Sequence, residues 1–263
     1  MLPSYIHDGV ALPRHFLIFI CLALTACYRE SGGAKREVTV AAAANLSAVF
    51  QQVGPRFEAE TGIHPVFSFA STAQLTQQIE NSAPFDIFAA ADSQHVDDLD
   101  LRGLLTPGSR TIYARGVLAL WIPPRSPARM DRIEDIDSPT VHVIAIANPQ
   151  LAPYGEAATE TLRRLGLWDK VRSKVVYAEN ISMAKEYGTS KNADAVFTAY
   201  SLVLHENGQV LRVDGNLHAP IDQELGIIAK SSRQDEARQF AAFLLAGNGR
   251  GILNSFGYQT PAR

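Results

Sequence analysis

The chain has 263 residues, of which 46% are hydrophobic and 19% charged, and its formal net charge is −3. This composition is typical of a folded globular protein with one large core or two modest lobes, and it excludes a disordered chain or one with many membrane spans. Lysines and arginines are scattered along the sequence, so we expect no concentrated basic face and no nucleic-acid partner.

The first 26 residues have the pattern of a bacterial export signal. Arg14 and His15 precede an apolar run over residues 16–23, which is too short to cross a bilayer as a stable helix. The sequence Leu-Thr-Ala-Cys then ends at Cys27 and resembles a lipobox, in which the cysteine becomes the acylated first residue of the mature protein. We therefore predict a lipoprotein signal peptide over residues 1–26 and a flexible tether over residues 27–35.

This leader also predicts where the protein works. A lipidated Cys27 would hold an exported, periplasmic protein at a membrane surface. The alternative is an ordinary secreted protein with a misplaced start codon, but a signal-peptidase cut after Ala26 would put Leu24 where a small residue is preferred. The only other cysteine, Cys21, lies within the leader, so no disulfide, cysteine metal site or thiol nucleophile is expected in the exported domain.

From Glu37 onward, short apolar strand patterns alternate with amphipathic helix patterns, which indicates an α/β protein with mainly parallel sheets. Asn45 is predicted to cap the first helix, which Gly62 would end, and Ser71-Thr72 opens the second. The predicted strands cover residues 38–44, 64–69, 85–92, 117–122, 142–147, 175–177, 195–200 and 224–229. Later helices are predicted at 154–167 and 234–245, and residues 182–187 are predicted to begin a further helix. The helix at 234–245 is expected to end the fold.

This order fits two similar lobes that the chain joins by two crossings. We predict that residues 36–114 and 223–263 form lobe 1 and that residues 115–222 form lobe 2. A single doubly wound domain is the alternative, and periodicity alone does not exclude it.

No known catalytic pattern is found, so we do not expect an enzyme. The chain has no Gly-x-Ser-x-Gly motif, no Walker loop and no dinucleotide-binding glycine pattern. The histidines show no i, i+4 pairing of the kind that binds zinc, and we expect no direct protein ligands to a metal and no cofactor. Asp86 and Asp92 could form a carboxylate pair, but a cap and a turn support are the roles that their spacing favours.

Four strand-to-helix turns carry small or hydroxylated residues instead of charges. They are Ala44-Asn45, Ser71-Thr72, Pro153-Tyr154-Gly155 and Asn180-Ile181-Ser182. In a parallel sheet such turns share one edge, where helix N-termini aim unpaired N–H groups at an anion. A fully deprotonated dianion such as molybdate, tungstate or sulfate offers only acceptors and suits a shell of donors. The competing interpretation is that Asn45 and Thr72 only cap helices.

Several stretches, taken together, resemble the molybdate-binding periplasmic proteins of ABC transporters over residues 37–258. They include residues 38–46, 67–72, 83–92, 145–155, 178–181 and 217–221. The resemblance implies a type II periplasmic-binding-protein fold whose two lobes, each a mainly parallel sheet flanked by helices, close on the anion. By position it implies ligand-binding roles for Ala44, Asn45 and Thr72 in one lobe and for Tyr154 and the Ile181 N–H in the other.

The resemblance is not complete. Many relatives have serine where Asn45 stands, and some have a late tyrosine where this chain has Thr198. Thr198 is therefore a secondary candidate, as is Ser71 beside Thr72, and Tyr154 would supply the function of the late tyrosine.

We thus expect a monomeric binding protein that delivers molybdate or tungstate to an ABC permease and its ATPase. The alternatives are a binding protein for another oxyanion such as sulfate, or an oxyanion-sensing lipoprotein without a transport role. The lipobox would make the chain a tethered variant, since the relatives are usually soluble in the periplasm.

Overall fold

The computed structural model describes residues 36–260, and the predictions about the export signal, the tether and Cys27 lie outside them. The strands are β1 (Glu37–Ala43), β2 (His64–Ala70), β3 (Ile87–Ala89), β4 (Thr111–Arg115), β5 (Leu118–Ile122), β6 (Ile144–Ala147), β7 (Val175–Ala178), β8 (Ala195–Ala199), β9 (Gln209–Arg212) and β10 (Asp222–Ile227). The α-helices are α1 (Ser47–Thr61), α2 (Thr72–Glu80), α3 (Gln94–Leu101), α4 (Pro153–Arg164), α5 (Trp168–Val171), α6 (Ile181–Thr189), α7 (Tyr200–Val203), α8 (Gln234–Leu245) and α9 (Gly247–Ser255). Short 3₁₀ helices are η1 (Ala44–Leu46), η2 (Ile133–Asp137), η3 (Arg172–Lys174) and η4 (Gly215–Leu217).

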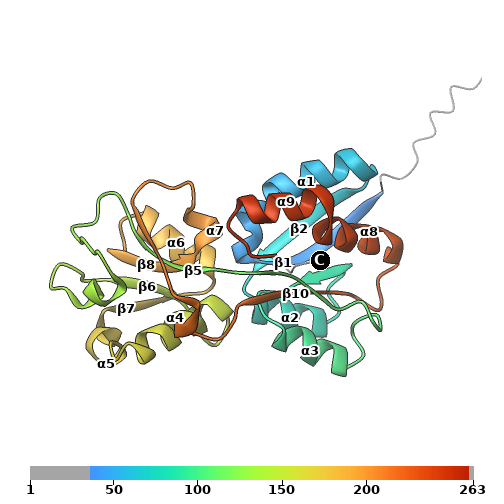
Figure 1. The fold of residues 1–263 in the computed structure, drawn as a ribbon. Helices are drawn as coiled ribbons and strands as arrows, with labels where there is room; N and C mark the ends of the chain where they lie inside the picture. Colours follow the sequence, from blue (N-terminus) through green and yellow to red (C-terminus); the bar gives the residue numbers. More distant parts are fainter. Residues whose placement is uncertain (1–35, 261–263) are drawn as a thin grey trace, which may run out of the picture. The chain divides into compact units, whose positions relative to one another are not determined.

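The strands form two five-stranded sheets of the same plan (Figure 1). The first has the order β2-β1-β3-β10-β4 and the second β7-β6-β8-β5-β9. β10 is antiparallel to both of its neighbours, and so is β5 in the second sheet, while the remaining pairs are parallel. The other four strands of each sheet therefore share one direction, which confirms the predicted two-lobed, mainly parallel α/β fold.

Helices cover the first sheet on both faces (Figure 1), with α1, α8 and α9 on one side and α2 and α3 on the other. We call the first sheet with these helices lobe 1, and the second sheet with α4 to α7 lobe 2. On α1, Phe50 and Phe57 are completely buried and pack with their rings edge-on to Phe240 of α8. The helix ends where Gly62 adopts a left-handed φ of 69°, as predicted. Within residues 36–260, no helix is both long and apolar enough to cross a membrane.

The chain passes between the sheets twice, from β4 to β5 and from β9 to β10. The two crossings are bonded to each other, because the Gly116 N–H donates to the Ile221 carbonyl at 2.8 Å. The C-terminal segment joins them, since Arg115 and Gln259 exchange backbone hydrogen bonds of 2.6 and 2.9 Å. We call the two crossings, which are joined at Arg115, Gly116, Ile221 and Gln259, the hinge segment. It lies beside the turns that carry the candidate site.

Three predicted features of the fold were wrong or missing. The fold does not end with α8, because α9 follows it through the glycine-rich stretch 247–251. Glycine disfavours a helix locally, but it is required here, since a Cβ at Gly249 would stand 2.7 Å from the Phe243 ring of α8. The edge strands β4 and β9 and the short α5 were not predicted, and the helix predicted at 154–167 is α4, which ends at Arg164.

Candidate functional site

The four predicted turns meet, because residues next to them bond across from one lobe to the other. The Ser182 hydroxyl donates to the Ala44 carbonyl at 2.8 Å, and the Ala73 N–H donates to the Leu151 carbonyl at 3.2 Å. The Gln74 amide also donates to the carboxylate of Glu179. Every residue predicted for the site is at most 4% exposed; these residues are Ala44, Asn45, Ser71, Thr72, Tyr154, Ile181 and Thr198.

We call the region where the four turns meet between the lobes the junction. Several backbone N–H groups at this junction have no acceptor. Thr72 and Ile181 are the first residues of α2 and α6, and Tyr154 is the second residue of α4. First-turn N–H groups have no acceptor within their own helix, and no other acceptor for these three, or for the Asn45 N–H, occurs among the residues that the structure describes. Both lobes thus contribute unused donors to one small region.

Side-chain hydroxyls of three predicted site residues are also unused. The Thr72 oxygen accepts from the Ala91 N–H at 3.3 Å, and its own hydrogen makes no hydrogen bond within the described chain. The Thr198 hydroxyl is buried without any partner, and the buried Tyr154 hydroxyl, which has the Asn45 side chain beside it, has no acceptor for its hydrogen. The pKa of Tyr154 is raised well above its ordinary value, mainly by burial and then by the neighbouring phenols of Tyr258 and Tyr113. Leaving such a donor unsatisfied costs about 1–3 kcal/mol, so these hydroxyls favour binding of an acceptor.

Asn45 has a different role from the one its position in the sequence predicted. The first long helix begins at Ser47 after Leu46, and the Asn45 side chain makes no cap. Its amide donates instead to Gln223 at 2.7 Å and to the Tyr258 hydroxyl at 2.9 Å, so both amide hydrogens are used within the protein. The predicted capping role is therefore wrong, and the group that Asn45 has left for a ligand is its backbone N–H.

The partners of Asn45 were missed by sequence analysis. The Asn45 carbonyl accepts from Tyr258 at 2.9 Å and from Ser201 of lobe 2 at 3.2 Å, and Ser201 also bonds to Tyr258 at 3.1 Å. Burial raises the pKa of Tyr258 to about 12, so this phenol stays protonated and able to donate. These residues come from distant parts of the chain and no local pattern marks them; a buried glutamine at the start of β10 is the one hint, seen only once the sheet is known.

Ser71, unlike Asn45, does cap a helix with its side chain. Its oxygen accepts from the Gln74 N–H, and the Gln74 side chain bonds back to Ser71, which together form a capping box on α2. Because its hydroxyl hydrogen is donated to Gln74, Ser71 has no side-chain donor left for a ligand. Gln74 joins this cap to Glu179, so the helix start and the contact between the lobes share one side chain.

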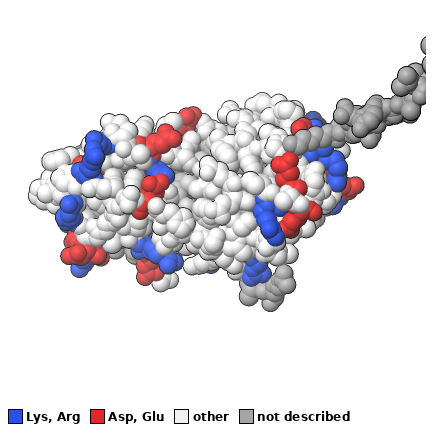
Figure 2. Space-filling view, turned by 90° about the horizontal axis from the view of Figure 1, so that it is seen from above, with Lys and Arg blue, Asp and Glu red and all other residues white. Residues whose placement is uncertain are grey.

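No basic side chain takes part in the contacts that join the lobes at the junction. The starts of α2, α4 and α6 supply partial positive charge there instead. On the face seen in Figure 2, basic and acidic side chains are interspersed and no continuous basic area is present. Among the described residues, no group of three or more His, Cys, Asp or Glu side chains could hold a metal ion. This arrangement suits a small anion that offers only acceptors.

The family model for bacterial extracellular solute-binding proteins matches residues 38–259. The chain belongs to this family. Among its relatives, the molybdate-binding protein ModA of Rhodobacter capsulatus is 33% identical over 225 residues, covering 85% of this chain and 88% of the relative. The ModA protein of Azotobacter vinelandii is 32% identical over 243 residues, covering 89% and 93%. The solved periplasmic molybdate-binding protein of Azotobacter vinelandii superposes with a TM-score of 0.81 at 31% identity, covering 86% of this chain and all of that one.

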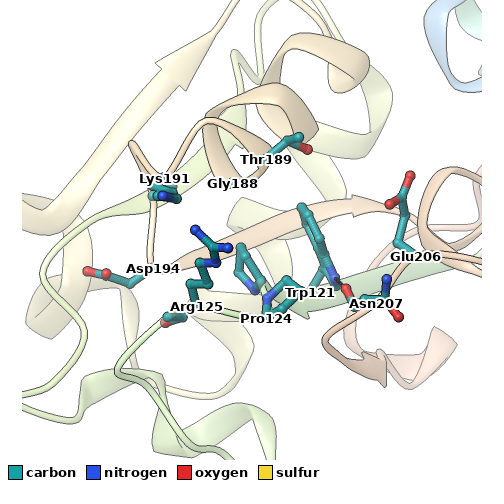
Figure 3. A pocket seen from close by; sticks show the side chains of 12 residues that line it. Trp121, Pro124, Arg125, Gly188, Thr189, Lys191, Asp194, Glu206 and Asn207 are labelled. Carbon is teal, nitrogen blue, oxygen red and sulfur yellow. Dashed lines mark hydrogen bonds between the residues drawn. The ribbon is translucent and has the colours of Figure 1, made fainter.

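This solute-binding protein also has a pocket of about 400 Å³ at the far end of α6, within lobe 2. In Figure 3 the Trp121 and Pro124 rings lie between Arg125 on one side and Glu206 and Asn207 on the other. Its acidic groups are already used: Asp194 accepts from two backbone N–H groups at 2.8 and 3.0 Å, and Glu206 pairs with Lys185. The pocket shares no lining residue with the junction, so the two are separate features of the molecule.

Proposed function

We propose that this protein is the solute-binding component of an ABC importer and captures molybdate, or tungstate, between its lobes. One observation carries the proposal: N–H groups of Thr72, Tyr154 and Ile181, from both lobes, and the hydroxyls of Thr72 and Thr198 are buried without acceptors. The names of the relatives in Rhodobacter capsulatus and Azotobacter vinelandii support molybdate as the ligand class.

The chemistry of the donors favours a dianion without protons. Each helix N-terminus contributes about 0.3–1 kcal/mol to anion binding, and each hydrogen bond to a charged group about 1.5–3 kcal/mol. A few such donors reach the roughly 8 kcal/mol of a micromolar complex. Hydrogen phosphate carries a proton that requires an acceptor, and the four turns offer no free carboxylate, so it is bound more weakly.

The proposed ligand set is the N–H groups of Asn45, Thr72, Tyr154 and Ile181, with the hydroxyls of Thr72 and Thr198. Ala44 adjoins it and accepts from Ser182 across the junction, so it contributes to closure as well as to the shape of the site. Ligand binding favours the closed lobes, and the closed form docks on the permease. The exported protein acts as a monomer held at the membrane by a lipid on Cys27.

A calorimetric titration of the purified protein against molybdate, tungstate, sulfate and phosphate tests the ligand. We expect micromolar or tighter binding of molybdate and tungstate and the weakest binding for phosphate. Because a ligand that binds only the native state stabilises it, molybdate at 100 times its Kd should add about 2.7 kcal/mol to the free energy of unfolding. No thermal shift with molybdate far above micromolar concentrations would overturn the proposal.

The anchor and the transport role need a separate experiment in cells. A Cys27→Ser variant should lose lipid labelling and leave the membrane fraction, while its affinity for molybdate stays within about twofold of wild type. Loss of molybdate uptake on deletion of the gene, restored by the wild-type chain, supports the importer. Unchanged uptake after deletion argues instead for a sensor without a transport role.

A further inference from the structure

The ring of Tyr154 reaches from lobe 2 to the hinge segment. Tyr154 lies in the first turn of α4, yet its phenol lies directly against Gly116 in the first crossing. A Cβ at Gly116 would stand 2.8 Å from the Tyr154 Cζ, closer still to the Tyr154 hydroxyl oxygen, and 3.2 Å from the Gln223 Nε2. Contacts this short do not occur between real side chains, so the phenol and a side chain at residue 116 exclude each other.

Backbone conformation does not explain why residue 116 is glycine. Gly116 is not among the glycines of the described chain that have a positive φ, so any residue could adopt its backbone. Its backbone is held in place, because its N–H donates to Ile221 of the second crossing at 2.8 Å. The requirement for glycine is therefore one of space, and the group that occupies the space is the Tyr154 phenol.

The start of α4, which carries Tyr154, cannot move away from residue 116 easily. The start of α4 is fixed against β6, since a Cβ at Gly155 would stand 2.7 Å from the carbonyl carbon of Ala147. The backbone N–H of Tyr154 is one of the unused donors of the junction, and its ring is 1% exposed. A side chain at residue 116 would thus push the ring toward the buried polar groups around Asn45 rather than toward solvent.

We infer that Gly116 is a positioning residue of the oxyanion site: it leaves room at the hinge for the Tyr154 phenol and so keeps the ring out of the space between the donors. This inference rests on the proposed function. Gly116 itself offers nothing to the ligand; it acts through Tyr154, whose N–H stays aimed at the anion while the phenol lies against the hinge.

The test is a double-mutant cycle read by calorimetry with molybdate. Gly116→Ala should weaken binding about 10- to 100-fold, since overpacking of this size is resolved by displacing the ring. Tyr154→Ala keeps the backbone donor and removes the ring, so adding Gly116→Ala to it should change affinity by less than about twofold. Gly215→Ala is the matched control, because Gly215 lies in the second crossing and a Cβ there meets nothing within 4 Å.

The cycle separates the positioning role from stiffening of the hinge. An equal loss with tyrosine and with alanine at residue 154 would assign the effect to the hinge backbone and overturn the inference, as would wild-type affinity in Gly116→Ala. If Gly116→Ala does not fold, the double variant should fold with a Tm close to that of Tyr154→Ala; failure of both also overturns the inference. A wild-type protein that binds none of the oxyanions overturns the proposed function instead, and this is seen before any variant is compared.

Discussion

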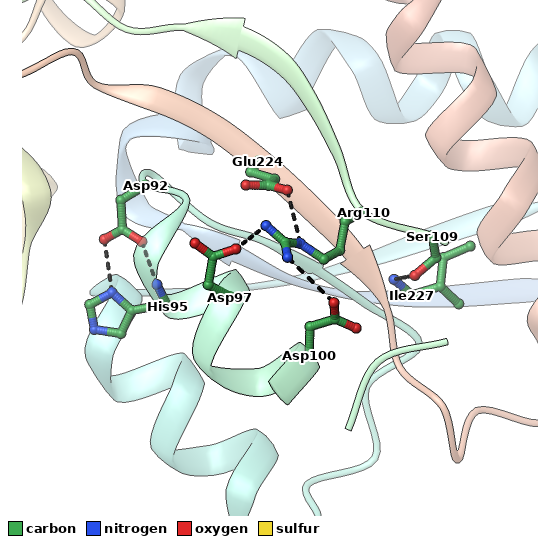
Figure 4. A network of polar contacts seen from close by, with 8 residues as sticks. All are labelled: Asp92, His95, Asp97, Asp100, Ser109, Arg110, Glu224 and Ile227. Atoms are coloured by element: carbon green, nitrogen blue, oxygen red, sulfur yellow. Dashed lines mark hydrogen bonds and ion pairs between the residues drawn. The ribbon is translucent and has the colours of Figure 1, made fainter. Parts of the chain in front are cut away.

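The protein has two polar regions that differ in how their polar groups are used. The first is the junction described above, where neutral donors lie buried and unused. The second surrounds Arg110 (Figure 4), whose guanidinium bonds to Glu224 at 3.1 Å, to Asp100 at 3.4 Å and to Asp97. There every charged group has a partner, and Glu224 is only 5% exposed.

The difference indicates which polar groups serve the fold and which serve a ligand. Arg110 ties α3 to β10, which leads out of the second crossing, so its charges are used up in holding elements together. At the junction the protein leaves donors unsatisfied, which costs stability and is recovered only when an acceptor binds. Variants of the junction should therefore change affinity more than stability, and variants of the Arg110 cluster should do the reverse.

The largest effect is expected from removing one backbone donor. Ile181 is the first residue of α6 and follows Asn180 in an extended conformation, with φ −148° and ψ 175°, so proline is compatible with this position. Ile181→Pro deletes the N–H, and Ile181→Ala loses similar packing but keeps the donor. By titration with molybdate, the proline variant should bind about 100-fold more weakly than the alanine variant. Equal affinities would show that this N–H does not face the ligand.

Substitutions in the Arg110 cluster should change the free energy of unfolding rather than the affinity for molybdate. Arg110→Ala leaves the buried Glu224 without its cation and should lower the free energy of unfolding by about 2 kcal/mol, less than for a fully buried pair because Arg110 is partly exposed. Denaturant unfolding measures this. Arg238→Ala breaks an exposed pair with Asp235 and should cost less than about 0.5 kcal/mol. A tenfold loss of molybdate affinity in Arg110→Ala would contradict the separation of the two regions.

Much of the fold could be predicted because its signals are local. The apolar periodicity of α1, the glycine that ends it and the alternation of strands with helices each depend on neighbours in the sequence. The start of α9 could not be predicted, because three glycines there favour a loop until the packing of Gly249 against α8 is known.

The candidate site was predictable in position but not in detail. Thr72, Tyr154 and Ile181 begin helices after buried strands, and this pattern places their N–H groups. The use of the Asn45 amide depends on Gln223 and Tyr258, which lie 178 and 213 residues further along the chain. The requirement for glycine at residue 116 depends likewise on the Tyr154 ring of α4, and no local pattern indicates it.

Ser71 and Thr72, at the start of α2, allow a ligand-binding residue to be compared with a structural one within a single turn. Thr72→Val removes the unused hydroxyl and the acceptor for Ala91, whereas Ser71→Ala removes the cap of α2. Each should cost about 1 kcal/mol of stability. Molybdate affinity should fall about tenfold in the first variant and stay within about twofold in the second. Thr72→Ser, which keeps the hydroxyl, is the control, and equal losses for Thr72→Val and Ser71→Ala would return Thr72 to a structural role.

The smallest effect is expected at His95 of lobe 1, which bonds to Asp92 at 2.8 Å (Figure 4). That hydrogen bond and the negative charges of Asp92, Asp98 and Glu156 raise the pKa of His95, although burial opposes them. Because the folded pKa is higher than the unfolded one, the folded state holds its proton more tightly. The stabilisation is complete below the unfolded pKa of about 6.5 and is lost as the pH rises through the folded pKa.

Urea unfolding of the wild type and of His95→Gln at several pH values measures this contribution. The difference in unfolding free energy should shrink by less than about 1 kcal/mol from about pH 6 to about pH 9, since the pair is partly solvated. Glu156, whose pKa is raised mainly by burial, changes stability in the same direction but at lower pH, so it does not mask the effect. A difference that grows with pH would mean that the folded protein favours neutral His95, and Asp92 would then act as a cap of α3 rather than as the partner of a cation.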